Sequence, residues 1–193
     1  MAAAVALVLL LAGCGSAFDP TGPCTTDGKV AGAYPDLEAL VPKTYNGAGP
    51  TELDSGRTCS TEGLGSLAAH GVKELRFAGA TWTTGTQSGL TLATFTSAAG
   101  AELDPAWLSE FYETTARAAP KVTSIDTSQV TIRGDIAALR LDVLNDESYQ
   151  TVLVWSAGGR VDAVLVGDFI REVPTKDAHE TIVQAALASY LGG

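Results

Sequence analysis

The sequence predicts an α+β fold, with a single antiparallel sheet of about six strands and two long helices packed on one face. Two observations lead to this prediction. Strand-like segments follow one another with short glycine-containing connections, which are typical of antiparallel hairpins. Two long helical segments interrupt the series, one after the first strand pair and one at the end. The chain has 193 residues, of which 46% are hydrophobic, and this suits one domain with a sizeable core.

The first residues form an uncharged apolar run, from Met1 to Ala12. This run is shorter than the roughly 20 apolar residues of a membrane-spanning helix, so it predicts a signal peptide over residues 1–13. The motif that follows, Leu11-Ala12-Gly13-Cys14, resembles the lipobox of bacterial lipoproteins. In that family the cysteine is acylated with diacylglycerol and the signal is cut just before it. The resemblance implies that Cys14 is lipidated and anchors the protein to the extracytoplasmic face of the cell membrane. The alternatives are an ordinary signal peptide or a buried apolar N-terminus.

Residues 14–32 combine the lipidated cysteine with a stretch rich in Gly, Thr and Pro. This composition predicts a flexible linker that lifts one α+β domain, residues 33–193, off the lipid surface. Two further cysteines, Cys24 and Cys59, form an even set in an oxidising compartment. They predict a disulfide bond, and two free thiols are the alternative.

The first part of the domain predicts short helices and many turns. Pro35–Pro42 reads as one or two helical turns that Asp36 can cap, and Thr61–Gly71 as a second short helix. Between them, residues 44–56 are rich in turn signals such as Asn46-Gly47 and Ser55-Gly56. We therefore expect a disulfide-held segment without regular strands before the sheet.

The regular elements follow in order. A hairpin comes first, then a helix that begins after Asp104 and ends before Pro120, with Leu108, Phe111 and Thr115 on one face. A last helix follows four more strands and begins near Lys176, with Thr175 or Asp177 as its cap. The expected strands are residues 72–83, 90–96, 122–132, 136–144, 149–155 and 160–166.

This order of elements is similar to that of PsbP-like extrinsic proteins, a resemblance that implies only a fold. The last two strands are apolar on both faces, because Val152 and Val154 alternate with Leu153 and Trp155. With both long helices on one face, the segment from Cys24 to Gly71 is the remaining material that could cover the other. We therefore expect this segment to pack across the second face.

The composition excludes several kinds of function. The formal net charge is −10 and there is no basic run, which argues against binding to nucleic acid. Sequence motifs for nucleotide binding or a serine nucleophile are absent from the chain. His179-Glu180 begins like a zinc-protease motif, but Val183 occupies the position of the second histidine. We therefore predict no catalytic residues, no metal and no cofactor.

Two tryptophans in strands, Trp82 and Trp155, could line a groove for an apolar ligand, or they could belong to the core. The sequence thus favours a lipid-anchored binding or interaction module of the cell envelope. Its partners would be the membrane, through the anchor, and an envelope protein or a small apolar ligand. An envelope hydrolase with a spatially assembled site and a purely structural lipoprotein are the alternative functions.

Overall fold

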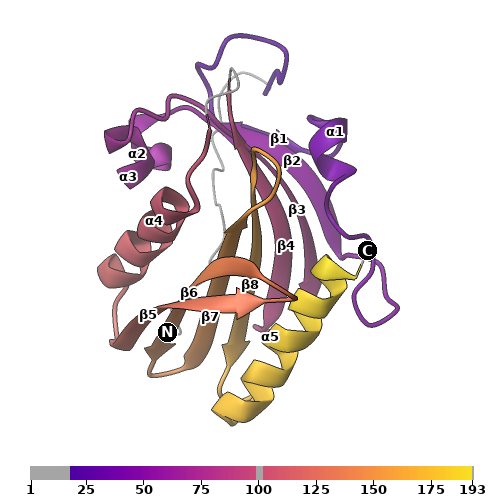
Figure 1. Ribbon diagram of the computed structural model, residues 1–193, viewed down its shortest axis with the longest axis vertical. Helices are drawn as coiled ribbons and strands as arrows, with labels where there is room; N and C mark the ends of the chain where they lie inside the picture. Colours follow the sequence, from indigo (N-terminus) through magenta and orange to yellow (C-terminus); the bar gives the residue numbers. More distant parts are fainter. Residues whose placement is uncertain (1–17, 99–101, 193) are drawn as a thin grey trace.

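The computed structural model describes residues 18–98 and 102–192. Its centre is one eight-stranded sheet in which all neighbouring strands are antiparallel (Figure 1). The spatial order is β1-β2-β3-β4-β8-β7-β6-β5, so the last four strands form a meander that returns to pair with β4. The strands are β1 (Gly28–Val30), β2 (Glu52–Thr58), β3 (Leu75–Thr83), β4 (Gly89–Ser97), β5 (Val122–Ile132), β6 (Ile136–Asn145), β7 (Ser148–Ser156) and β8 (Val161–Phe169).

The two long helices begin where the sequence offers caps. The side chains of Asp104 and Thr175 accept hydrogen bonds from backbone N–H groups at the starts of the two long helices, as predicted. Asp36 does not cap the first short helix, which begins after Tyr34 without a side-chain cap. Gly65, at φ +51°, divides the expected second helix into two. The helices are α1 (Pro35–Glu38), α2 (Thr61–Leu64), α3 (Ser66–Ala69), α4 (Pro105–Ala118) and α5 (Lys176–Leu191).

The prediction of about six strands is wrong, because β1 and β2 add two strands at one edge of the sheet. β2 contains Ser55-Gly56, which the sequence suggests is a turn. In the structure Gly56 lies opposite Phe77 of β3 and Lys29 of β1. A Cβ atom at Gly56 would overlap the Gly28 carbonyl oxygen, so glycine permits the close approach of β1. The glycine therefore marks tight strand packing and not a turn.

The two long helices lie on opposite faces of the sheet, so the prediction that both pack on one face is also wrong (Figure 1). α4 packs on β5, β6 and β7, whereas α5 packs on β8, β4 and β7. Leu108 of α4 and Val154 of β7 belong to one apolar cluster, and Val183 of α5 and Leu153 of β7 belong to the other. Both faces of β7 are apolar because each face meets its own helix.

The segment from Cys24 to Gly71 does not cover one face as predicted but contributes to the sheet and to both faces. Its strands β1 and β2 extend the sheet. α1 and the loop after it lie on the α5 face, where Val41 and Tyr45 are buried near Trp82. α2 and α3 lie on the α4 face, and α3 contacts α4 directly. With a helix already on each face, neither face is left for the segment to cover alone.

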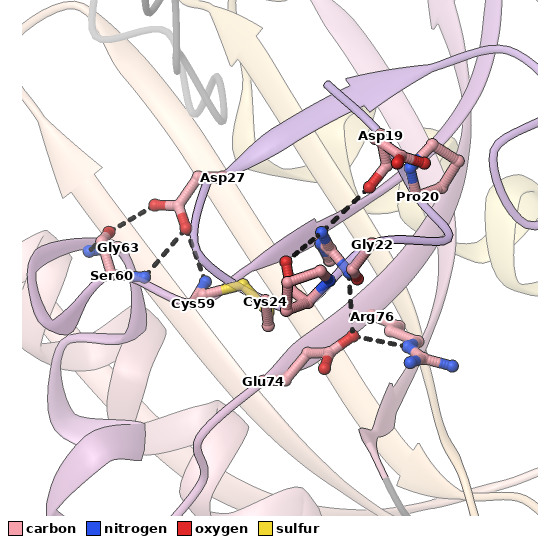
Figure 2. The surroundings of a disulfide bond; sticks show 12 residues. Asp19, Pro20, Gly22, Cys24, Asp27, Cys59, Ser60, Gly63, Glu74 and Arg76 are labelled. Carbon is pink, nitrogen blue, oxygen red and sulfur yellow. Dashed lines mark hydrogen bonds and ion pairs between the residues drawn. A yellow bond between two sulfur atoms is a disulfide. The ribbon is translucent and has the colours of Figure 1, made fainter. Parts of the chain in front are cut away.

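The predicted disulfide between Cys24 and Cys59 is confirmed (Figure 2). It joins the residues before β1 to the residue after β2, with the two Cα atoms 5.7 Å apart, within the usual range. Asp27 reinforces this connection, because its Oδ1 atom accepts the backbone N–H groups of Cys59 and Ser60 at 2.5 and 2.8 Å. The start of the domain is therefore tied to the sheet by a covalent bond and by a carboxylate.

Buried Arg57 on β2 holds the residues that precede the disulfide. Its guanidinium group donates to the carbonyl oxygens of Asp19, Gly22 and Pro23 at 2.8–3.0 Å. It also lies over the Phe18 ring, with 5.6 Å between the guanidinium carbon and the ring centroid. Residues 18–30, which lie inside the stretch expected to be a flexible linker, are thus packed against the sheet or paired with it.

Candidate functional site

A cavity of about 290 Å³ lies between α4 and the face of the sheet that α4 covers. Side chains from all eight strands contribute to its lining, together with α4. A volume near 300 Å³ is at the lower limit of known small-molecule sites. This cavity is the clearest candidate for a binding site in the part of the chain that the structure describes.

Small residues create the space. Gly79 of β3 lies directly opposite Ala93 of β4, and both line the cavity floor. α4 contributes the small residues Thr115 and Ala116 to the lining. A Cβ atom at Gly79 would meet only the Thr91 methyl group, at 3.4 Å, so the backbone does not require glycine there. The cavity therefore depends on side-chain size at a few positions.

Aromatic rings form the apolar part of the lining. Phe77 and Phe95 lie on neighbouring strands with their ring centroids 6.5 Å apart, and Phe111 and Tyr112 come from α4. Burial raises the pKa of the Tyr112 hydroxyl, so this side chain stays neutral. An apolar group placed here would be surrounded by rings and methyl groups, an environment that favours burial of hydrocarbon.

Three charged residues lie where the cavity reaches β1 and β2. The Lys29 ammonium is 2.6 Å from Asp54 Oδ2 and 3.1 Å from Glu52 Oε1. Burial raises the pKa of Asp54, with Glu52 adding to the effect and Lys29 opposing it. The hydrogen bond from Lys29 lowers the pKa of Glu52. At the β6–β7 side the polar lining residues are the uncharged Asn145 and Gln150.

A second polar cluster lies on the α5 face and connects α5 to the sheet. His179 Nδ1 is 2.7 Å from Asp168 Oδ2, and His179 Nε2 is 2.9 Å from Thr151 Oγ1. This Asp–His–Thr arrangement resembles a nucleophile triad. However, Thr151 donates its only hydroxyl proton to Asp142, at 2.6 Å. His179 Nε2 therefore donates to the Thr151 hydroxyl oxygen, and His179 cannot act as a base toward Thr151.

Burial also argues against catalysis by this cluster. The side chains of Asp168 and His179 are 0 and 3% exposed, and Thr151 is buried as well. Arg140 completes the cluster. It forms ion pairs with Asp142 at 2.7 Å and with Glu180 of α5 at 2.6 Å. The hydrogen bond from Arg140 lowers the pKa of Glu180 to about 2. The geometry is that of a structural network that fixes α5 on the sheet.

The two tryptophans suggested as groove residues are buried on the α5 face. Trp155 packs edge-on against Tyr190 of α5, and the Trp82 indole donates to the Ala48 carbonyl oxygen at 3.1 Å. Neither lines the cavity, which lies on the other face of the sheet. The proposed lipidation site, Cys14, lies outside the described residues.

Other site types find no support in residues 18–98 and 102–192. Within these ranges no three side chains of His, Cys, Asp or Glu are grouped so as to hold a metal ion. No helix of the described parts has the length and apolar character needed to cross a membrane. The chain matches no known protein-family model and no curated protein. Within the described residues, the cavity is therefore the feature that points most directly to a function.

Proposed function

We propose that this chain is a lipid-anchored protein of the extracytoplasmic membrane face that binds an amphipathic small molecule between α4 and the sheet. The observation that carries this proposal is the cavity, which combines aromatic walls with a charged group at one end. Amphipathic molecules match this combination, because their apolar part leaves water while their polar end stays hydrated or paired.

The cavity supports binding more than hydrolysis. A hydrolase of the kind considered from the sequence needs a nucleophile within reach of a general base. Among the described lining residues, Thr81, Thr91, Thr115 and Tyr112 carry hydroxyl groups, and none is a histidine. His70 pairs with Glu110 near the end of α3, and His179 is enclosed under α5. The described lining residues thus offer a surface for binding without a nucleophile–histidine pair.

Filling the cavity tests the proposal. The Gly79→Val variant is expected to weaken binding of the neutral dye Nile red by about tenfold, because added methyl groups occupy the space at a cost of about 1–3 kcal/mol. Valine favours strands, so the fold should persist. Gly167→Val is the matched control, since Gly167 is also a strand glycine, lies outside the lining and has open space where a Cβ atom would lie.

Fluorescence titration of the purified protein measures both variants. Wild type and Gly167→Val should bind the dye alike, and Gly79→Val should bind it weakly. If wild-type protein does not bind the dye, or if both variants bind it as wild type does, the cavity is not the ligand site.

The anchor makes a separate prediction. Cys14→Ala should transfer the protein from the detergent-rich to the aqueous phase in a cloud-point partition experiment, because the acyl chains supply the membrane affinity, about 0.8 kcal/mol per buried methylene. Cys24→Ser is the control, since Cys24 lies in a disulfide and should not affect partitioning. Unchanged partitioning of the Cys14→Ala protein would overturn the lipid anchor while leaving the cavity proposal intact.

A further inference from the structure

The charged end of the cavity carries an excess of negative charge. Two carboxylates, Asp54 and Glu52, face one ammonium group, that of Lys29. Asp54 is the more enclosed of the carboxylates, with 14% of its side chain exposed against 58% for Glu52. The side chains of these three residues therefore sum to one net negative charge when both carboxylates are ionised.

Lys29 is not free to receive an anion. Its ammonium already contacts both carboxylates at 2.6 and 3.1 Å, and it is the only cation among the described lining residues. An anionic head group would have to approach Lys29 beside two like charges, which is unfavourable. A cationic head group would instead find two carboxylates that share a single ammonium.

We infer that the cavity selects an amphipathic molecule with one short apolar chain and a cationic head group, the chain lying over Gly79 and Ala93 and the head group at Asp54 and Glu52. This inference rests on the proposed function and names its ligand class. The small volume of the cavity, about 290 Å³, favours a single chain over a lipid with several.

The raised pKa of Asp54 is consistent with a cationic head group at this position. Burial raises the pKa of its carboxyl group, so the ionised form is less stable there than in water. A cation placed beside Asp54 would favour the ionised form and lower that pKa again. Binding of a cationic ligand in mildly acidic solution should therefore release protons, which calorimetry in buffers of different ionisation enthalpy can measure.

The test compares three ligands of equal chain length: decylammonium, decanol and decanoate. Their dissociation constants are measured by displacement of Nile red from the folded protein, below the concentrations at which they form micelles. We expect decylammonium to bind most tightly and decanoate most weakly. Asp54→Asn should weaken decylammonium binding roughly tenfold, the effect of losing a charge-assisted hydrogen bond, and should leave decanol binding unchanged.

Two controls separate the local site from the overall negative charge of the protein. Asp135→Asn makes the same charge change in the exposed turn between β5 and β6, outside the lining, and should leave all three affinities unchanged. Lys29→Gln makes the charged end more negative and should strengthen the preference for decylammonium. If Asp54→Asn does not fold, Glu52→Gln removes a carboxylate from the same group at an exposed position.

The outcomes distinguish the inference from the proposed function. If decanol binds and decanoate binds as tightly as decylammonium, or if Asp135→Asn has the same effect as Asp54→Asn, the charge preference is overturned and the cavity remains a binding site. If none of the three ligands binds, the proposed function itself fails.

Discussion

Replacement of His179 with leucine is expected to lower the free energy of unfolding by about 3–5 kcal/mol, the usual effect of removing one partner from a buried, hydrogen-bonded acid–base pair. The variant leaves Asp168 as an enclosed carboxylate, and one oxygen of Asp168 already has no hydrogen-bond partner in the described structure. Thr151 also loses a donor. Chemical denaturation followed by circular dichroism measures the change.

The second histidine provides a matched control. His70 Nε2 contacts Glu110 at 2.8 Å, almost the same distance as in the buried pair, but its side chain is 31% exposed and that of Glu110 is 51% exposed. His70→Leu should therefore cost less than about 1 kcal/mol. The double variant His179→Leu with Asp168→Leu should be more stable than His179→Leu alone, because no unpaired charge remains. Equal effects of His179→Leu and His70→Leu would show that burial does not govern the strength of these pairs.

Removal of the disulfide is expected to have the next largest effect. The bond connects residues 35 positions apart, and the chain-entropy estimate for such a loop is about 3–4 kcal/mol. The variant with both Cys24→Ser and Cys59→Ser should lose this stability and still fold, because Asp27 and Arg57 continue to hold the same segment. The loss should appear as a lower denaturation midpoint with a native circular dichroism spectrum.

Reduction of the wild-type protein provides an independent measurement of the same quantity. Added dithiothreitol should bring the midpoint of wild type down to that of the double variant and should not change the midpoint of the variant. If the double variant unfolds at the wild-type midpoint, the disulfide does not contribute to stability. If dithiothreitol lowers the denaturation midpoint of wild type alone, the loss of stability comes from this disulfide bond.

The parts of the fold that could be predicted are those with local signals. Asp104 and Thr175 begin their helices as expected, since a cap needs only a side chain next to the first turn. The hairpins at Gly134 and Gly158 could also be predicted, because these turns require positive φ angles, which glycine adopts readily. β2 lacks such a signal, because most of its residues are polar and they do not alternate with apolar ones. The need for glycine at position 56 becomes clear only from the close approach of the neighbouring strand β1.

The arrangement of the helices and the cavity depends on contacts between distant residues. Apolar residues on both faces of β7 are compatible with two arrangements: one helix on each face, or both helices on one face and another segment on the second face. The sequence alone does not distinguish these two arrangements. The cavity requires that Gly79 and Ala93 be neighbours and that α4 present small residues above them. The one available signal was the pair of small residues in adjacent apolar strands. Of the stripe expected on this helix, Leu108 is buried, and Phe111 and Thr115 line the cavity beside the buried Tyr112 and Ala116.

The contacts of Arg57 with residues 18–23 limit the distance between the domain and a membrane to which Cys14 would be anchored. Phe18 and Asp19 are already in contact with Arg57, and Phe18 follows Cys14 by four positions in the sequence. Four residues of fully extended chain span at most about 14 Å. If Cys14 carries the proposed lipid anchor, no long linker separates the domain from the membrane, and the disulfide end of the sheet lies close to the lipid head groups. An amphipathic ligand partitions into that same bilayer, so its surface density there, and not its concentration in bulk water, would govern how often the cavity is occupied.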